Sequence, residues 1–249
     1  MLSRMLKGLF RPLYNLYYRN LFLPSVERAQ LQGRLDAVDS KKQMLHPAME
    51  YAHYSLEGGD YLEFGIYRGN TFSLAYRIAQ KWKKLAGMRF YAFDSFEGLP
   101  PSEGVDVEGY EHEVFAEGNY ACDEPNFRKN LAAKGVDLTK IETIPGWYDQ
   151  SLNEETRKRL PLEKAAIIWI DCDLYESTVP VMKFITPYVQ NGTLLIFDDW
   201  FCFHSNPDRG EQRAFREWLE RNPEIRATPF LSFGWHGHSF ILRRVDAQP

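Results

Sequence analysis

The sequence contains few cysteines and no long apolar run. Its three cysteines, Cys122, Cys172 and Cys202, are widely spaced among 249 residues, so they form neither a disulfide framework nor a Cys-x-x-Cys zinc pattern. Such sparse cysteine usage favours a reducing compartment, and we expect a cytoplasmic protein. The sequence has no run of about 18 apolar residues, so no segment is predicted to span a membrane.

The sequence also lacks the motifs that bind nucleoside triphosphates. It has no GK[ST] phosphate loop and no complete GxGxxG, which argues against hydrolysis of ATP or GTP. With 34 acidic side chains against 30 Lys and Arg, the net charge is −4, so we expect no nucleic-acid partner. The length suits one α/β domain with a small appendage.

The first 26 residues contain no acid, although four basic side chains occur there: Arg4, Lys7, Arg11 and Arg19. Apolar pairs recur three or four residues apart, which predicts an amphipathic helix that Pro12 interrupts. We expect residues 1–45 to form a helical segment that packs on the rest of the protein, as a lid, or on a partner subunit. The alternative is that residues 1–22 lie on the anionic inner face of a membrane as a peripheral contact.

Residues 46–249 are predicted to form one domain of alternating strands and helices. Strands are predicted at Asp60–Phe64, Met88–Phe93, Lys140–Pro145, Ala165–Ile170, Thr193–Phe197, Ile225–Ser232 and His238–Arg244. Helices are predicted from the turn after Phe64 to about Leu85, and at Asn126–Lys134, Ser177–Val189 and Gly210–Arg221. This order is typical of an α/β, doubly wound sheet of seven strands with an antiparallel edge and helices on both faces.

Residues 101–124 break the alternation of strands and helices. This stretch is long, poorly periodic and contains eight acids. Long loops in compact domains are commonly lids or unstructured segments. Tyr110, Phe115 and Tyr120 favour a lid that covers a substrate, and a solvated loop is the alternative.

Carboxylates directly follow two of the buried strands. Asp171 and Asp173 come after Ala165–Ile170, and Asp198 and Asp199 come after Thr193–Phe197. Ligands bind outside the carboxyl ends of strands in open α/β sheets, so Asp171, Asp198 and Asp199 are expected to meet there. Three carboxylates need protons or a cation to share a small space, and a hard divalent cation is the simplest solution. Asp173 alternatively caps the helix that follows it.

The first three strands are followed by residues suited to an adenosine cofactor. Gly65 and Gly69 form a turn whose main chain can approach a ligand closely. Asp94 ends the second strand, where an acid can accept both ribose hydroxyls. Gly146-Trp147-Tyr148 ends the third strand, where an adenine ring can lie against aromatic groups. Close strand–helix packing and a turn-capping aspartate are the alternatives, but the order of these features favours the cofactor.

Four motifs within about residues 60–220 are more specific: Leu62-Glu63-Phe64-Gly65-Ile66-Tyr67-Arg68-Gly69, Phe93-Asp94-Ser95-Phe96-Glu97-Gly98-Leu99-Pro100, Asp171-Cys172-Asp173-Leu174-Tyr175-Glu176-Ser177-Thr178 and Asp198-Asp199. Together they resemble the macrocin O-methyltransferase family, the sugar methyltransferases of macrolide and aminocoumarin pathways. The resemblance implies a class I, Rossmann-like methyltransferase fold, S-adenosylmethionine (SAM) as methyl donor and Mg²⁺ as metal. The metal spacing is more distantly similar to that of catechol O-methyltransferases.

The resemblance also implies roles for individual residues. Mg²⁺ is held by Asp171, Asp198 and Asp199, and Asp171 is also the base that takes the proton of the acceptor hydroxyl. The implied SAM contacts are Glu63, Gly65, Tyr67, Gly69, Thr71, Asp94, Ser95, Gly146, Trp147, Tyr148 and Asp171. The implied acceptor is a hydroxyl of a deoxysugar, glycoside or glycan, and a homo-oligomer is expected. Cys172 stands where the family often has a small residue, and we expect it to point into the sheet.

Other functions remain open on the sequence alone. A catechol offers Mg²⁺ the same pair of adjacent oxygens as a sugar. Asp171 as nucleophile and Asp173 as acid fit a metal-dependent phosphatase, although the glycine turn and Asp94 then have no role. A non-catalytic protein of the same fold would bind a partner or membrane through residues 1–22.

Two short segments have a structural and a functional interpretation. His236-Gly237-His238 contains two closely spaced imidazoles, which we interpret as surface or pocket-rim histidines rather than a metal pair. The segment from Arg209 to Arg213 comes soon after the strand Thr193–Phe197 and its two aspartates. It is either a contact for an anionic substrate group or a solvated helix start.

Overall fold

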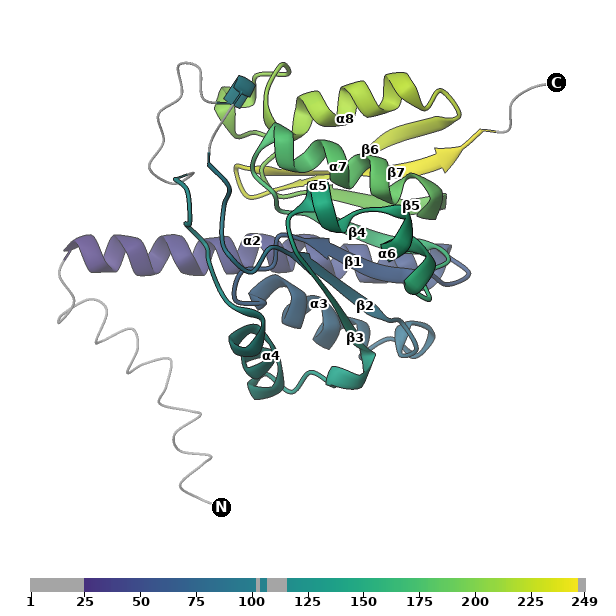
Figure 1. Ribbon diagram of the computed structural model, residues 1–249. Coiled ribbons are helices and arrows are strands. Elements are labelled where there is room, and N and C mark those ends of the chain that lie inside the picture. The colour runs from purple at the N-terminus through teal and green to yellow at the C-terminus, as the bar shows by residue number, and fades with distance from the viewer. Residues whose placement is uncertain (1–24, 102–103, 107–115, 246–249) are drawn as a thin grey trace. The chain divides into compact units, whose positions relative to one another are not determined.

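The protein is built on one seven-stranded sheet with the strand order β3-β2-β1-β4-β5-β7-β6 (Figure 1). The computed structural model describes residues 25–101, 104–106 and 116–245, with side chains described from residue 39 onward. The strands are β1 (Asp60–Phe64), β2 (Phe90–Asp94), β3 (Ile141–Pro145), β4 (Ala165–Ile170), β5 (Val189–Phe197), β6 (Ile225–Phe233) and β7 (Gly237–Arg244). The first five run parallel, and β7 is antiparallel to both neighbours. The predicted α/β sheet with an antiparallel edge is confirmed.

Helices connect the strands. The α-helices are α2 (Ser25–Ser55), α3 (Asn70–Ala79), α4 (Glu124–Ala133), α5 (Tyr148–Ser151), α6 (Glu154–Arg159), α7 (Tyr175–Ile185) and α8 (Gly210–Arg221). Short 3₁₀ turns are η1 (Lys83–Leu85), η2 (Gly104–Asp106), η4 (Leu138–Lys140), η5 (Thr186–Tyr188) and η6 (Phe203–Ser205). The chain divides into two compact units between Lys41 and Lys42, and the larger unit holds the whole sheet.

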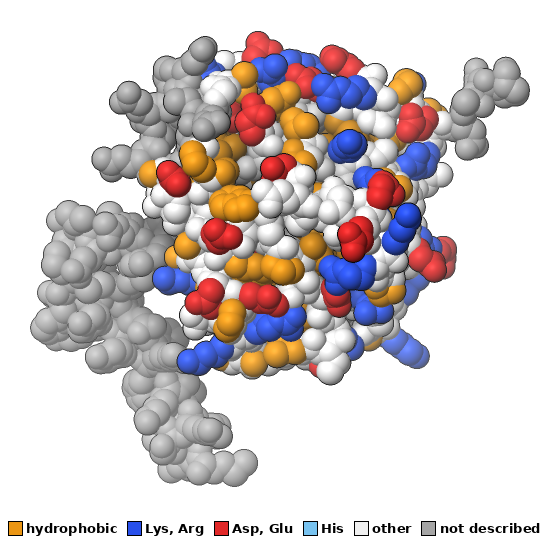
Figure 2. All heavy atoms as spheres, viewed as in Figure 1, with side chains coloured by type: hydrophobic (Ala, Val, Ile, Leu, Met, Phe, Trp, Pro, Cys, Tyr) orange, Lys and Arg blue, Asp and Glu red, His pale blue; other side chains and the backbone are white. Residues whose placement is uncertain are grey.

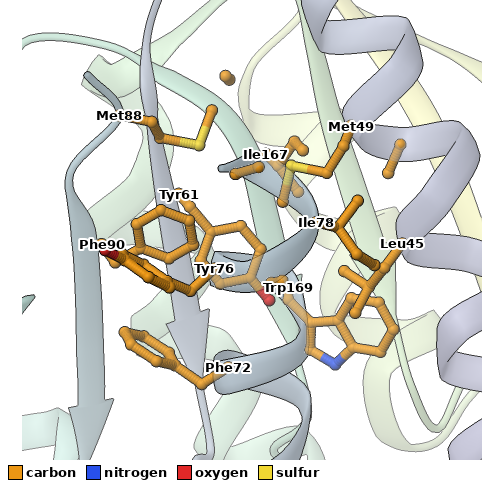
Figure 3. Packing of buried hydrophobic residues seen from close by; sticks show 14 of the residues in the cluster. Leu45, Met49, Tyr61, Phe72, Tyr76, Ile78, Met88, Phe90, Ile167 and Trp169 are labelled. Carbon is orange, nitrogen blue, oxygen red and sulfur yellow. The ribbon is translucent and has the colours of Figure 1, made fainter. Parts of the chain in front are cut away.

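One face of the sheet packs against α3, α4 and the part of α2 that follows Lys41. Successive side chains of a strand point to opposite faces, so Tyr61 of β1 belongs to this side while its neighbours Leu62 and Phe64 do not. Figure 3 shows Tyr61 beside Phe90, with Leu45 of α2 in the same buried cluster. This face is rich in buried aromatic side chains, and they hold α3 and the part of α2 after Lys41 against the strands.

The opposite face packs against α7 and α8. Phe64 and Phe93 stack on each other with ring centroids 4.3 Å apart, and Phe184 of α7 packs edge-on against both. Phe215 and Trp218 bring α8 to the same cluster. Helices therefore cover both faces, as predicted, and the central strands are buried on both sides.

Several element boundaries differ from the predictions. The helix predicted after β1, which is α3, ends at Ala79 instead of about Leu85. It stops there because Trp82 has an extended main chain and packs its ring 4.7 Å from that of His53 in α2. The helix predicted at residues 177–189 ends at Ile185, and β5 begins at Val189, earlier than predicted. Two helices, α5 and α6, were not predicted.

Charged side chains of both signs are interspersed over the face of the molecule in Figure 2. This mixture agrees with the small net charge of −4, and it gives that face no broad field of one sign. Residues 1–24 lie outside the described part of the chain, so the amphipathic helix and its proposed contacts stay predictions. Among the described residues, no helix is long and apolar enough to cross a membrane.

Candidate active site

The carboxyl ends of the five parallel strands are joined by four main-chain hydrogen bonds that continue one residue past the sheet. The four donors and acceptors, 2.8–3.0 Å apart, are Gly146 N–H to Asp94 O, Gly65 N–H to Phe93 O, Asp171 N–H to Phe64 O and Asp198 N–H to Ile170 O. The residues that follow each strand are therefore held in register with their neighbours. This register places the predicted site residues along one edge of the sheet.

Three aspartates meet at that edge. One carboxylate oxygen each of Asp171, Asp198 and Asp199 lies within 4.8 Å of the other two. Asp198 is buried, and Asp171 and Asp199 are partly buried. The structure thus brings together the three side chains that the sequence grouped as metal ligands. Their oxygen atoms are the donors that hard divalent cations prefer.

A fourth carboxylate, Glu211, lies against this cluster. It stands in the first turn of α8 and is 1% exposed. Its Oε2 accepts a hydrogen bond of 3.0 Å from the main-chain N–H of Asp199. Burial raises the pKa of Glu211 well above its usual value, and the negative charges of Asp199, Asp198, Asp171 and Asp173 raise it further. The segment from Arg209 to Arg213 contains this buried acid, so its interpretation as a solvated helix start is wrong.

The turn that carries Asp198 and Asp199 is held from several sides. Gln212, next to Glu211, donates through Nε2 to the carbonyl of Trp200 at 2.6 Å. Cys202 places its Sγ 3.4 Å from Asp199 Oδ1. His236 Nδ1 lies 2.6 Å from the carbonyl oxygen of Asp198, which requires the proton on that nitrogen. His236 is therefore at the rim of the site.

The glycine turn after β1 approaches the carboxylate cluster closely. A Cβ added at Gly65, which has φ +84°, would lie 1.8 Å from the carbonyl oxygen of Asp171. Only glycine permits this contact between the ends of β1 and β4. Gly69 has φ +70° and begins α3, and Thr71 is buried in the first turn of that helix.

Asp94, at the end of β2, binds the glycine turn directly. Its Oδ2 accepts from the N–H of Ile66 at 2.6 Å and more weakly from that of Tyr67 at 3.4 Å. Its Oδ1 accepts from the N–H of Phe96 at 2.6 Å, as a turn aspartate does. Burial raises the pKa of Asp94 although these three donors act in the opposite direction. Oδ1, which accepts a single hydrogen bond from these donors, retains a second lone pair for a ligand.

The remaining predicted cofactor residues surround this turn. Glu63 is buried in β1 and accepts a hydrogen bond of 2.5 Å from the hydroxyl of Tyr61. Ser95 accepts from the N–H of Glu97 at 3.1 Å and donates to the carbonyl of Gly98 at the same distance. Ser95 lies in the turn that follows β2, whereas Glu63 lies in β1, one residue before its end, and is buried.

The third strand ends at Gly146, Trp147 and Tyr148. Trp147 is partly buried and precedes α5. The hydroxyl of Tyr148 donates to the carbonyl of Phe93 at 3.1 Å, and its ring packs edge-on against Phe64. Tyr148 thus packs against the hydrophobic cluster near the strand ends, and Trp147 lies in the turn before α5. Cys172 is buried in the same cluster, as expected.

Asp106 belongs to the acidic loop and accepts hydrogen bonds from the starts of two helices near the carboxylate cluster. It is 4% exposed, and its carboxylate accepts from the N–H of Tyr175 at 2.5 Å and of Gly210 at 2.9 Å. These donors begin α7 and α8, so one side chain caps two helices. Asp173 therefore does not provide the cap at Tyr175. Most other acids of the loop lie outside the described residues, as do Tyr110 and Phe115.

Tyr120 is the described aromatic residue of the predicted lid. It is 46% exposed, and its ring meets that of Tyr67 edge-on at 5.6 Å. Burial raises the pKa of Tyr120, and the negative charges of Asp173, Asp199 and Asp171 raise it further. Both tyrosines have positive φ, 61° for Tyr120 and 47° for Tyr67, a conformation that is unfavourable for such side chains.

Comparison with known proteins identifies the family. Residues 39–222, about three quarters of the chain, match the macrocin-O-methyltransferase (TylF) family. The chain belongs to this family. The matched region begins within α2 and ends just after α8. It therefore contains all four motifs named above and the carboxylates Asp171, Asp198, Asp199 and Glu211.

Curated relatives of this chain are named as O-methyltransferases. The chain is 31% identical over 146 residues to the 8-demethyl-8-(2,3-dimethoxy-alpha-L-rhamnosyl)-tetracenomycin-C 4'-O-methyltransferase of Streptomyces olivaceus, covering 57% of this chain and 53% of the relative. It is 27% identical over 150 residues to the mycinamicin III 3''-O-methyltransferase of Micromonospora griseorubida, covering 57% and 55%. The chain thus spans about half the length of the curated relatives it matches.

Solved structures share the fold. The O-methyltransferase NovP matches with a TM-score of 0.65 and 21% identity, over 82% of this chain and 80% of NovP. The calicheamicin methyltransferase CalS11 matches with a TM-score of 0.67 and 19% identity, over 91% and 89%. The class I methyltransferase fold expected from the motifs is therefore confirmed.

Proposed function

We propose that this protein is a SAM-dependent O-methyltransferase that methylates a hydroxyl of a sugar and uses a divalent cation, with Mg²⁺ as the expected ion. The observation that carries the proposal is the meeting of Asp171, Asp198 and Asp199 beside the glycine turn of β1, in a chain of the macrocin-O-methyltransferase family.

The carboxylate cluster suits a hard cation. It presents three oxygen ligands within 4.8 Å of one another at the carboxyl ends of β4 and β5. Such a set of negative charges is costly in a partly buried place unless a positive charge offsets it. Mg²⁺ is commonly bound by few carboxylates and completes its shell with waters or substrate oxygens. Asp171, Asp198 and Asp199 are therefore the residues proposed to hold it.

The edge formed by β1, β2 and β3 suits SAM. Glu63, Gly65 and Tyr67 are proposed to lie along its methionine part, and Asp94 is proposed to accept the ribose hydroxyls. The wider set of proposed contacts is Gly69, Thr71, Ser95, Gly146, Trp147, Tyr148 and Asp171. Asp94 is well placed for this role because it already fixes the main chain at Ile66 and Tyr67.

The proposed reaction needs an activated hydroxyl in line with the methyl group. When bound, SAM supplies the methyl group on a sulfonium, and a divalent cation lowers the pKa of a neighbouring hydroxyl. Asp171 is proposed to accept the proton of that hydroxyl, as a base within hydrogen-bond reach. The main-chain register of β1, β4 and β5 holds Asp171 and the glycine turn in fixed positions, which favours a productive orientation.

The names of relatives support a sugar acceptor. The Streptomyces olivaceus relative is named as a 4'-O-methyltransferase of a rhamnosyl tetracenomycin, and CalS11 is described as a TDP-rhamnose 3'-O-methyltransferase. A deoxysugar, either on a natural product or on a nucleotide, is the proposed acceptor class. A catechol is the second candidate, because it presents the same adjacent oxygens to a cation.

Titration of SAM into metal-stripped protein, with and without Mg²⁺, tests the proposal first. Saturable binding is expected, and TDP-rhamnose and catechol then serve as acceptor probes, with formation of S-adenosylhomocysteine as the readout. Asp171→Asn is expected to lower kcat by about 10²- to 10⁴-fold and to reduce SAM affinity by a much smaller factor. Absence of SAM binding under every metal condition would exclude the methyltransferase proposal.

The roles of the N-terminal segment remain separate proposals. Residues 1–45 are proposed to serve as a lid or a subunit contact in a homo-oligomer, and residues 1–22 as a peripheral membrane contact. Removal of residues 1–22 distinguishes these roles, since loss of vesicle binding with intact methyl transfer would assign the segment to the membrane.

A further inference from the structure

Glu211 is a buried carboxylate for which the proposed reaction has no role. One of its oxygens is accounted for, since Oε2 accepts from the N–H of Asp199. The other, Oε1, is buried and has no hydrogen-bond partner among the described residues. A buried carboxylate oxygen without a partner is unfavourable, so its presence needs an explanation.

The surroundings of Glu211 contain several negative charges. Asp171, Asp173, Asp198 and Asp199 all act on Glu211 as like charges. Within the described part of the chain, no Lys, Arg or His forms an ion pair with it. Packing alone gives no reason for an acid here, because an uncharged side chain of the same shape would avoid the repulsion.

The fold nevertheless holds Glu211 firmly in this place. Gly210 donates its N–H to Asp106, which fixes the start of α8. A Cβ at Gly210 would lie 2.9 Å from the ring of Phe203 and 3.5 Å from the carbonyl of Asp173, so the helix start packs tightly. Together with the bond from Gln212 to Trp200, these contacts set the first turn of α8 against the turn after β5.

We propose that Glu211 is a positioning residue of the cation site, which holds the Asp198–Asp199 turn through Asp199 and adds negative charge that increases the affinity for a divalent cation. The inference rests on the proposed function, because it assumes the cation site of Asp171, Asp198 and Asp199. A bound divalent cation offsets the repulsion among these acids, and the partner-free oxygen of Glu211 is available to a water of the cation's hydration shell. Residues behind the direct ligands commonly tune metal affinity in this way.

Glutamine at position 211 separates charge from hydrogen bonding. Its carbonyl oxygen still accepts from the N–H of Asp199, whereas the negative charge is lost. We expect Glu211→Gln to weaken Mn²⁺ binding by about 10- to 100-fold, measured from the electron paramagnetic resonance signal of free Mn²⁺ in metal-stripped protein. A purely structural hydrogen-bonding role predicts wild-type affinity for this variant.

Glu217→Gln provides the matched control on the same helix. Glu217 lies six residues farther along α8, where it pairs with Arg213 and Arg221 instead of contacting the carboxylate cluster, so the Mn²⁺ affinity of this variant is expected to equal that of the wild type. Glu211→Asp keeps the charge but shortens the side chain, and it is the second variant if glutamine prevents folding. Its loss of Mn²⁺ affinity is expected to be smaller than that of Glu211→Gln.

The outcomes separate the two proposals. Wild-type protein that binds Mn²⁺, with Glu211→Gln binding equally well, would overturn the role of Glu211 and leave the cation site intact. Wild-type protein that binds no Mn²⁺, in parallel with Asp198→Asn, would overturn the cation site and with it the role of Glu211. A smaller rise of Tm with Mn²⁺ in Glu211→Gln than in Glu217→Gln would support the proposal independently of activity.

Discussion

The side chain of Asp106 caps two helices at once, so its removal is expected to destabilise the fold more than the loss of an ordinary cap. Replacing an N-cap side chain by alanine typically costs about 1 kcal/mol. In Asp106→Ala, the N–H groups of Tyr175 and Gly210 both lose their acceptor, and a buried donor left without a partner costs about 1–3 kcal/mol. We therefore expect a loss of about 2–4 kcal/mol.

Two further variants calibrate this value. Asp106→Asn offers one carbonyl oxygen in place of two carboxylate oxygens, so one of the two bonds is kept and about half the loss is expected. Asp123→Ala removes an exposed cap of α4, which accepts from the N–H of Asn126 at 2.8 Å, and is expected to cost about 1 kcal/mol.

The assay is urea unfolding followed by tryptophan fluorescence and circular dichroism, with the free energy of unfolding extrapolated to water. The order of stability is expected to be wild type, Asp123→Ala and Asp106→Asn, with Asp106→Ala lowest. If Asp106→Ala lost no more than Asp123→Ala, the double cap would not contribute as the geometry indicates.

Two other predictions concern the cofactor edge. Gly65→Ala is expected to lower the free energy of unfolding by about 3 kcal/mol or more, since its Cβ would lie 1.8 Å from the carbonyl oxygen of Asp171. Gly118 has a similar φ of +77°, but none of the described residues has an atom within 4 Å of a Cβ added there. Gly118→Ala should therefore lose only about 1 kcal/mol. Thermal unfolding compares them, and equal losses would contradict the close approach. Burial raises the pKa of Asp94, so its ionised form disappears at a higher pH than that of an exposed aspartate, whose pKa is about 4. SAM affinity measured by calorimetry should fall as the pH decreases through that raised pKa, whereas Asp94→Asn should bind weakly and without this pH dependence. A wild-type affinity that stays constant over the same range would show that the carboxylate does not hold the ribose.

The parts of the fold that the sequence predicts well are those set by local pattern. The runs Asp60–Phe64 and Ala165–Ile170 have the predicted bounds, because apolar runs of this length between turn signals define a buried strand. The helix Gly210–Arg221 was also predicted with its bounds, from its amphipathic pattern. The motifs led to the family, which the match over residues 39–222 confirms.

The parts that the sequence did not predict depend on contacts between distant residues. The start of α7 at Tyr175 is fixed by Asp106, 69 positions earlier, and no local signal near Tyr175 shows it. Glu211 looks like a solvated acid in a helix of mixed charge, and only the position of α8 against β5 buries it. Helix α6 was missed although its signals were local, since Asn153 caps it through the N–H of Thr156.

The same contrast holds within the candidate site. The grouping of Asp171, Asp198 and Asp199 followed from strand order alone, because the carboxyl ends of parallel strands share one edge. The contacts that hold these acids did not follow, since His236, Gln212 and Glu211 come from segments far along the chain. Strand order therefore indicates where ligands gather, whereas tertiary packing determines how they are oriented.

The main-chain bonds past the strand ends have a consequence for how this family diversifies. Asp171 and Asp198 are held through their N–H groups to Phe64 and Ile170, and these bonds do not involve the side chains. Any residue with an N–H group can make the same bonds, so a substitution at either position leaves the frame in place. New acceptors or metals can thus arise during evolution by single changes at the sheet edge, without a simultaneous change in the hydrophobic interior.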